Sequence, residues 1–287
     1  MFTQKYDSVA HYANLAFELG VTHNGGEDNL FLDMNLWTWI RQSEIDTNPD
    51  AKAISGVVAN QGSVPLMGDN SSRNREIALF RSVASSWTTN ELHYPSREFI
   101  ALFDTLTDLR CEFFFYDYIG RWGIISGDTL RDSRRRINRQ AQLQKTNGFS
   151  YPEILLMRAE GRARTGNLAG AVEDLNLLRQ YRHRTGTSDL TLAQFAGQDA
   201  VIQEVINERR RELPIQSPKR VFDLKRFINE PGKPWSKTSI THTVKGVAYT
   251  ANIDSDAFII PITNDILIWN PQWGIPLETR LWSNVIP

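Results

Sequence analysis

The chain has 287 residues, of which 41% are hydrophobic and 23% are charged, and its formal net charge is -1. This composition is that of an ordinary globular protein without an acidic or basic tail. A nucleic-acid-binding protein usually carries a surplus of Lys and Arg to neutralise phosphates, so the balanced charge predicts no nucleic-acid partner. The single cysteine, Cys111, excludes a disulfide framework and a cysteine metal site within the chain, and we expect it to be buried.

The N-terminal segment is predicted to be a short amphipathic helix over residues 5–20, ended by Gly20. It lacks the basic start, apolar centre and cleavage site of a signal peptide, and no run in the chain approaches the roughly 18–20 apolar residues of a membrane span. Residues 21–75 have little periodicity and are rich in Gly, Asn, Asp and Ser, which predicts long irregular loops. Such loops are uncommon unless they bind something, pack on themselves or are disordered.

The next part of the chain predicts short mixed elements. We expect a strand at 76–83, a helix at 96–106 capped by Ser96, and a strand at 111–119. The basic stretch at 131–148 is predicted to be a solvated loop or strand edge, because it is too isolated to indicate phosphate binding.

Residues 151–184 predict an antiparallel helix pair broken at Gly166 and Asn167. Small residues within the pair allow close helix approach, as in a tetratricopeptide unit. They are Ala159, Gly161, Ala163 and Ala171. A single pair cannot bury its own apolar face, so other elements must cover it, and the N-terminal helix could be half of another pair.

A further helix is predicted over residues 199–213 and ends at Pro214. Its charges either form a salt-bridged solvent face or pair at a junction with Asp223 and Arg226, beyond the break. Residues 235–257 are polar and are interpreted as strand-like, and residues 263–265, "TND", start a short turn or helix.

Four of these segments in this order resemble the SusD/RagB family, the surface glycan-binding lipoproteins of certain Gram-negative bacteria. They are "YPEILLMRAEGRARTGNLAGAVEDLNLLRQYR", "EVINERRREL", "RVFDLKRF" and "IPITNDILIWNP". Upstream, residues 74–80 and 96–114 look like the middle segments of that family. The resemblance implies a mostly α fold, in which tetratricopeptide-like helix pairs support a loop-rich irregular portion with a few short strands. We treat 1–287 as a single SusD-like domain, the C-terminal part of the family fold, with the helix hairpin 151–184 within it.

The resemblance also implies a function. Family members bind oligosaccharide or polysaccharide at the cell surface and hand it to a SusC-like TonB-dependent outer-membrane transporter, without cleaving a bond. By similarity, Glu208, Arg209 and Glu212 have an architectural role. Two features depart from the family: "PIQSPK" at 214–219 places Gln216 near an acidic position, and the N-terminal half that carries the lipid-anchored cysteine is absent from this chain. We therefore expect either a fragment, an incomplete gene product, or a partner chain that supplies that half.

Sugar binding requires flat apolar faces for the pyranose ring and polar groups for its hydroxyls. The chain has eight Trp, and we expect Trp269 and Trp273 to pack in the core. The predicted glycan-binding residues flank polar loops; they are Trp37, Trp39, Arg81, Trp87 and Tyr94. The alternative for each aromatic among them is that it anchors a loop.

Enzyme activity is not expected. The five His are scattered without metal-ligand spacing, so we expect no metal and no cofactor. Asp117 and Asp128 could in principle form a glycosidase pair, but a chain with 33 acidic residues offers many such pairs. Residues 22–29, "THNGGEDN", indicate a turn, with a Ca²⁺-like oxygen site as the alternative. The alternative function is a tetratricopeptide-like protein-interaction module that binds no sugar.

Overall fold

The computed structural model describes residues 4–41, 54–59, 62–63, 76–79, 96–111, 115–118, 124–125, 128–129, 135–138, 148–213, 219–244, 247–253 and 264–274. The helices are α1 (Tyr6–Asn24), η1 (Glu27–Leu30), η2 (Met34–Leu36), α2 (Arg97–Ile100), α4 (Tyr151–Arg164), α5 (Leu168–Arg182), η6 (Leu192–Gln194), α6 (Gln198–Glu212), α7 (Lys219–Phe227), α8 (Asn264–Ile268) and η8 (Pro271–Trp273). The strands are β1 (Trp37–Arg41), β2 (Ile54–Ala59), β3 (Gly62–Ser63), β4 (Ile77–Leu79), β5 (Phe115–Tyr118), β6 (Ile124–Ile125), β7 (Asp128–Thr129), β8 (Arg135–Asn138), β9 (Phe149–Ser150), β10 (Ser239–Val244) and β11 (Val247–Asn252). The described part is mostly α-helical with a few short strands, as the sequence predicted.

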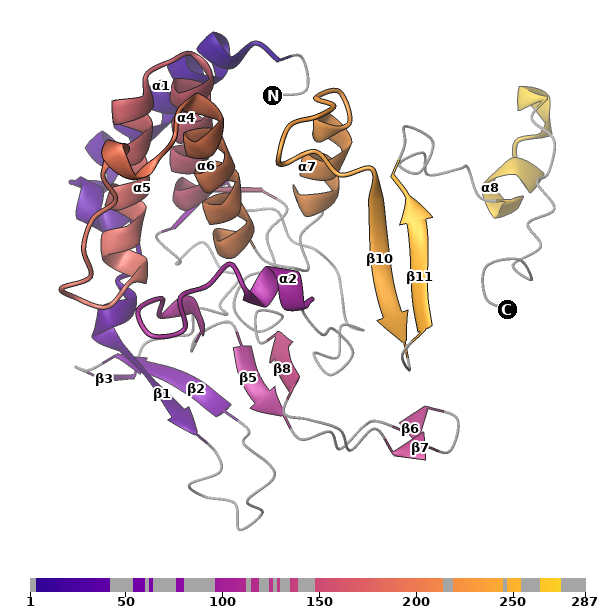
Figure 1. Ribbon diagram of the computed structural model, residues 1–287, viewed down its shortest axis with the longest axis horizontal. Helices are drawn as coiled ribbons and strands as arrows, with labels where there is room; N and C mark the ends of the chain where they lie inside the picture. The colour runs from indigo at the N-terminus through magenta and orange to yellow at the C-terminus, as the bar shows by residue number, and fades with distance from the viewer. Residues whose placement is uncertain are drawn as a thin grey trace.

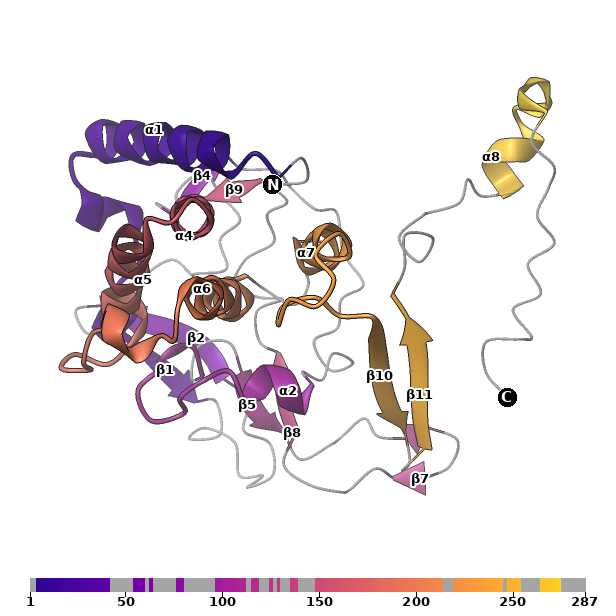
Figure 2. The same cartoon turned by 45° about the horizontal axis from the view of Figure 1, so that its top comes forward.

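Four helices, α1, α4, α5 and α6, form the body of the protein, which we call the helix stack (Figure 1). Ser150 caps α4 by accepting a hydrogen bond from the backbone N–H of Glu153, and Asn167 caps α5 in the same way. Helix α1 lies along α4, so it covers a face that the α4–α5 pair cannot bury alone (Figure 2). The hairpin of β10 and β11 and the short helix α8 lie beyond α7, away from the helix stack, in both views.

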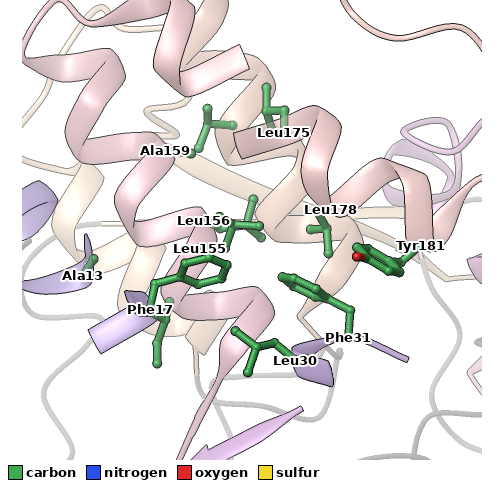
Figure 3. Close-up of a cluster of buried hydrophobic side chains, with 12 residues drawn as sticks. Ala13, Phe17, Leu30, Phe31, Leu155, Leu156, Ala159, Leu175, Leu178 and Tyr181 are labelled. Atoms are coloured by element: carbon green, nitrogen blue, oxygen red, sulfur yellow. The ribbon is translucent and has the colours of Figure 1, made fainter. Parts of the chain in front are cut away.

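The main core lies between α1, α4, α5 and the first short helix, η1 (Figure 3). Its centre is made by Leu155 and Leu156 of α4 with Leu175 and Leu178 of α5, all of which are fully buried. Phe31 stacks on Tyr181 with ring centroids 4.8 Å apart, which joins the segment after η1 to the end of α5. This core therefore fixes where the chain leaves η1 on its way to β1.

Two glycines pack closely against other parts of the chain: the role of Gly20 was not predicted, whereas Gly161 was expected to allow close helix approach. Gly20 does not end α1, contrary to prediction: the helix continues to Asn24 and is ended by Gly25 with φ 74°. Gly20 is buried under the ring of Tyr151, where a Cβ would lie 2.3 Å from a ring carbon. At Gly161 of α4, a Cβ would lie 2.7 Å from the backbone nitrogen of Ala10 in α1.

Other predicted elements change at their ends. The helix expected over 96–106 has its Ser96 cap, since Ser96 Oγ accepts a hydrogen bond from Phe99 N at 3.1 Å, but its α-helical part stops at Ile100. Asp104 then accepts hydrogen bonds from Leu106 N and Thr107 Oγ1, as acidic residues do in turns. In the stretch 131–148, strand β8 pairs antiparallel with β5, which corresponds to the strand-edge alternative.

Short pairings bring distant segments to the ends of α4 and α5. Strand β4 pairs with β9, and the backbone carbonyl oxygen of Glu76 accepts a hydrogen bond from the first backbone N–H of α4 at 2.8 Å. The segment before Cys111 pairs with the end of α5, where Leu109 N donates to Arg182 O at 2.9 Å. Cys111 itself is buried, as expected.

The contact of Gly161 with α1 gives a test of the helix packing. In an isolated helix, Gly161→Ala would stabilise by about 1 kcal/mol, because Ala has the higher helix propensity. Here we expect the opposite sign, since the new methyl group would meet the backbone of Ala10 and push α1 away. Urea unfolding measures the difference, with the exposed Glu173→Ala on α5 as the control. A more stable Gly161→Ala protein would contradict the packing.

Candidate functional site

The predicted glycan-binding residues lie mostly outside the described residues. Arg81, Trp87 and Tyr94 are not described, and neither are the side chains of Trp37 and Trp39. The backbone of these two tryptophans forms β1, which pairs antiparallel with β2 (Trp37 with Ala59, Trp39 with Val57). The structure thus places Trp37 and Trp39 on one strand, and their role in binding stays a prediction.

Asn35 ties the start of β1 to the loop that follows α5. Its side-chain nitrogen donates to His183 O at 2.9 Å, and its side-chain oxygen accepts from Thr185 N at 3.0 Å. Trp37 follows two residues later, so its Cα lies within about 7 Å of the Asn35 Cα. The beginning of the strand with the predicted aromatic residues is therefore next to this loop.

The same loop forms a polar pocket of about 170 Å³, which we call the α5 pocket. It is lined by Arg179, Gln180, His183, Arg184, Thr185, Gly186, Thr187, Ser188 and Asp189. His183 is the aromatic side chain of this lining, and nearly all of the lining residues carry hydrogen-bonding groups. We did not single out this pocket from the sequence. The signal available there was a run of Thr, Ser, Gly and Asp directly after a helix that ends in arginines.

His183 lies beneath the pocket in a chain of hydrogen bonds. Its Nε2 is 3.2 Å from Arg179 Nη1, which can only donate, so Nε2 accepts and the proton sits on Nδ1. Nδ1 is 3.3 Å from Thr107 Oγ1, whose hydroxyl donates to Asp104 Oδ2 at 2.8 Å. Burial lowers the pKa of His183 to about 4, and Arg110 and Arg179 act in the same direction against Asp108. His183 is therefore neutral at pH 7.

Arg182, the last residue of α5, is fully buried and joins three segments of the chain. Its Nη1 donates to Leu32 O at 2.7 Å, and its Nη2 donates to Glu76 Oε1 at 2.6 Å. Its Nε and Nη2 donate to the carboxylate of Glu212 at the end of α6. Glu76 also accepts from Leu32 N at 2.7 Å. The segment that leads into η2 and β1 is therefore fixed to α5 through both backbone polar groups of Leu32.

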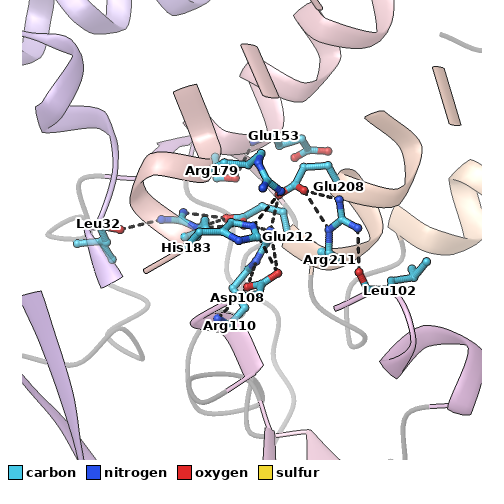
Figure 4. Close-up of polar contacts among 12 residues, drawn as sticks. Leu32, Leu102, Asp108, Arg110, Glu153, Arg179, His183, Glu208, Arg211 and Glu212 are labelled. Carbon is cyan, nitrogen blue, oxygen red and sulfur yellow. Dashed lines mark hydrogen bonds and ion pairs between the residues drawn. The ribbon is translucent and has the colours of Figure 1, made fainter. Parts of the chain in front are cut away.

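Arg110 makes a second buried arrangement beside the first (Figure 4). It forms a two-bond contact with Asp108 at 2.9 and 2.8 Å. Its Nη1 donates to Glu208 at 2.7 Å and to Glu212 at 3.1 Å. Because Glu212 also binds Arg182, one carboxylate connects the two arginines.

A third set of buried ion pairs joins α6 and α4 to α7. Arg209 donates to Asp223 at 3.0 Å and to Glu153 at 3.0 Å. Arg226 donates to Asp223 at 2.9 Å and to Glu160 at 2.7 Å. The predicted pairing of α6 charges with Asp223 at the junction is therefore confirmed, and the alternative of a solvent-exposed charged face is wrong. We call the ion pairs of Arg110, Arg182, Arg209 and Arg226 the charge network.

The pKa directions show how strongly these carboxylates are held. Burial alone would raise the pKa of Glu160, but the Arg226 guanidinium overrides it and lowers that pKa to about 2. In the same way, Arg110 and Arg211 outweigh burial and hold the pKa of Glu208 far below its ordinary value. At Glu76, burial prevails over Arg182 and the pKa is raised. Glu160 and Glu208 are thus ionised and fully paired, which suits a structural role and leaves neither as a proton donor or acceptor for a substrate.

Other predicted sites differ or are not described. Trp269 and Trp273 are exposed, 82% and 50%, contrary to the expectation that they pack in the core. In both views α8, which directly precedes Trp269, lies away from the helix stack, so these side chains do not reach the core of the stack. The side chains of Asp117 and Asp128 lie outside the described residues, so the structure does not place them relative to each other.

Metal ligands, the turn at residues 22–29 and membrane-spanning helices are considered next for the described residues. There, no group of three or more His, Cys, Asp or Glu side chains could hold a metal ion. Residues 22–29 form the end of α1, a turn at Gly25 and Gly26 and the start of η1, in line with the predicted turn. None of the described helices combines the length and the apolar character that crossing a membrane requires.

Comparison with known families gives one match, to the model described as the SusD family, over residues 126–264. This range includes α4, α5, α6 and α7, and hence the acidic and basic residues that join these helices in the charge network. This match supports the assignment of the chain to the SusD family. The resemblance that we assigned to residues 74–80 and 96–114 lies outside the matched range. No curated protein matched the chain.

Membership carries a general function. The SusD family binds glycans for uptake and is a nutrient-binding, non-catalytic family. The match includes α4 to α7, while α1, β1 and the segments with Arg81, Trp87 and Tyr94 lie upstream of it.

Removing one partner of the charge network should strongly destabilise the protein. Arg182→Met removes the buried cation that Glu76 and Glu212 share, although Glu212 keeps Arg110, and we expect a loss of about 3–5 kcal/mol in the free energy of unfolding. The control is Lys233→Met, which breaks an exposed pair with Asp199 and should cost less than about 1 kcal/mol. Chemical unfolding measures both values. Equal losses of unfolding free energy in the two variants would show that the buried ion pairs of the charge network contribute no more to stability than an exposed pair.

The lowered pKa of His183 predicts that the free energy of unfolding depends on pH between pH 5 and pH 7. Its pKa is about 4 in the folded protein and about 6.5 in the unfolded chain. Between these values the unfolded chain binds a proton that the folded protein does not, so stability falls as the pH decreases. We expect the free energy of unfolding to fall between pH 7 and pH 5, and His183→Gln to flatten that fall. An unchanged slope in the variant would contradict this assignment.

Proposed function

We propose that this protein is a non-enzymatic subunit that binds oligosaccharide or polysaccharide at the cell surface and delivers it to a SusC-like TonB-dependent outer-membrane transporter. The observation that carries the proposal is the SusD-family match of the helical scaffold. In this proposal the protein acts at the outer membrane and associates with the membrane only through a lipid anchor. It requires no cofactor and no nucleic acid.

The arrangement of the described residues supports a binding role on a rigid support. Function in such proteins is usually carried by loops that a rigid scaffold positions. Here, buried ion pairs fix Leu32 and Asn35 fixes the start of β1, so a strand with two tryptophans begins at a defined place beside a polar pocket. An aromatic face next to hydrogen-bonding groups is the combination that sugar rings require. We therefore keep Trp37 and Trp39, with Arg81, Trp87 and Tyr94, as the proposed glycan contacts.

A second candidate function is a tetratricopeptide-like protein-interaction module without sugar binding. It is favoured by apolar side chains on the outer face of α1, where Tyr12, Leu15 and Leu19 are exposed at helical spacing. Protein capture in a pull-down with no sugar retained in affinity electrophoresis would favour this alternative.

The proposed contacts are tested by separate Trp37→Ala, Trp39→Ala and Trp87→Ala substitutions. Loss of a stacking aromatic should weaken oligosaccharide binding about tenfold, with no change in the amount of folded protein. Trp269→Ala is the matched control, because Trp269 is exposed and directly follows α8, outside the proposed site. Affinity electrophoresis over a set of soluble polysaccharides gives the readout. Binding that survives all three substitutions would refute the assignment, and release of reducing ends would indicate a glycosidase instead.

A further inference from the structure

Arg220, at the start of α7, differs from the buried arginines described above. Each arginine of the charge network binds at least two carboxylates. The side chain of Arg220 is half-buried, yet among the described residues no hydrogen bond or ion pair reaches its guanidinium. We propose that Arg220, with Arg210 and Lys237, binds one oxyanion, a carboxylate or sulfate group carried by the glycan. We call these three side chains the α7 basic site. The inference rests on the proposed function, since it names the class of glycan.

The position of Arg220 on α7 turns its side chain toward α6. Residues four and seven apart lie on one face of a helix, so Arg220 shares a face with Leu224 and Phe227. Both of these are buried, and Phe227 belongs to the core cluster that contains Val201 and Ile206 of α6. Arg220 therefore lies on the inner side of the first turn of α7, where an unpaired charge is least favourable.

Asp223, one turn further along α7, does not neutralise Arg220. Its Oδ2 accepts a hydrogen bond from Arg209 at 3.0 Å, and its Oδ1 accepts one from Arg226 at 2.9 Å. Burial and the neighbouring charge of Arg210 lower the pKa of Arg220 to about 10, against the attraction of Asp223. The guanidinium is thus still charged at pH 7, in surroundings that disfavour a cation.

Glu98 of α2 is the other carboxylate that acts on Arg220, and two further cations share it. Both of its oxygens accept from Lys237 Nζ at 2.6 Å, and one accepts from Arg210 Nη1 at 3.2 Å. Lys237 lies between α7 and β10, and α2 lies at the lower end of α6 in Figure 1. Among the described residues, the α7 basic site therefore sets three positive charges against the single charge of Glu98, which favours binding of an anion.

An oxyanion would supply the hydrogen bonds that Arg220 lacks. A guanidinium offers five N–H donors in a planar fork that matches two oxygens of one anionic group. Arg210 has further donors besides the one that Glu98 accepts. A half-buried cation without a partner costs free energy in the empty protein, and such unfavourable groups are typical of binding sites.

The α7 basic site is within reach of one predicted glycan contact. Tyr94 lies four residues before Glu98, so their Cα atoms are at most about 14 Å apart. Glu98 in turn binds Arg210 and Lys237 of the site. A glycan that stacks on Tyr94 can therefore extend an acidic or sulfated unit toward Arg220.

Urea unfolding of the full chain tests whether Arg220 is free to bind an anion. Arg220→Met keeps the apolar length of the side chain and removes its charge, so without added anion we expect a urea midpoint equal to or above that of the parent. Millimolar sulfate at constant ionic strength should raise the midpoint of the parent and leave that of Arg220→Met unchanged. Lys225→Gln, which removes an exposed cation of α7, is the matched control and should respond as the parent does. A lower midpoint for Arg220→Met, or an equal response to sulfate in both proteins, would overturn the inference.

Calorimetry with glycans then identifies the source of the oxyanion. The probes are oligosaccharides of polygalacturonate and of κ-carrageenan, each compared with its carboxyl-reduced or desulfated form. We expect the parent to bind at least one anionic probe about tenfold or more tightly than the neutral form, because hydrogen bonds to a charged group are the stronger ones. Arg220→Met should abolish this preference and bind the neutral form as the parent does. Glu98→Gln, which removes a competing and exposed carboxylate, should strengthen binding of the anionic probe, and it provides the test if Arg220→Met does not fold.

The outcomes separate this inference from the proposed function. Equal binding of anionic and neutral forms, or a preference that survives Arg220→Met, refutes the inference and leaves the proposed function in place. A response to sulfate without a preference for an anionic glycan means an adventitious ion only, and overturns the assignment to a glycan. If no glycan of either class binds, the proposed function and the inference both fail.

Discussion

The structure depends on one buried cation, Arg182, and the groups that surround it. This guanidinium receives no water, yet its N–H groups reach the carbonyl of Leu32 and the carboxylates of Glu76 and Glu212. These partners are far apart in the sequence, so the single side chain decides where the segments before β1 and before β4 meet the helix stack. Glu212 extends the same constraint to Arg110 and the segment before Cys111.

Burying so many ions costs desolvation free energy, and this cost suggests a role for the charge network other than net stability. The desolvation penalty of a buried ion pair often cancels the attraction between its members, so such pairs add little net stability compared with apolar residues of the same size. They do make wrong arrangements expensive, because any displaced segment leaves a charge unpaired in a dry environment. We interpret the charge network as the device that gives irregular segments a unique position on the helices. A glycan site built from loops requires this, because its contacts must be in place before the ligand arrives.

The sequence predicted the helical scaffold well but not the segments that come together around the α5 pocket, for physical reasons. Helix α6 follows from its apolar spacing, and the junction role of Asp223 follows from charges on both sides of a break. Whether Glu208 faces solvent or the interior could not be decided, because its partner Arg110 lies in another segment and pairing at such a distance has no local signal. The end of α1 was misplaced because Gly20 resembles a helix stop, while its packing against Tyr151 is visible only in three dimensions. The α5 pocket was missed because Asn35 and the 183–189 loop are brought together only by folding.

Hydrogen exchange of the Arg182→Met protein tests the central claim most directly. If Arg182 positions the segments that carry the site, backbone amides from Leu32 to Arg41 and from Glu76 to Leu79 should exchange much faster than in the parent. The interiors of α4 and α5 should keep most of their protection, since their apolar core is untouched. Uniform acceleration across the helices, or unchanged protection around Leu32, would contradict the account.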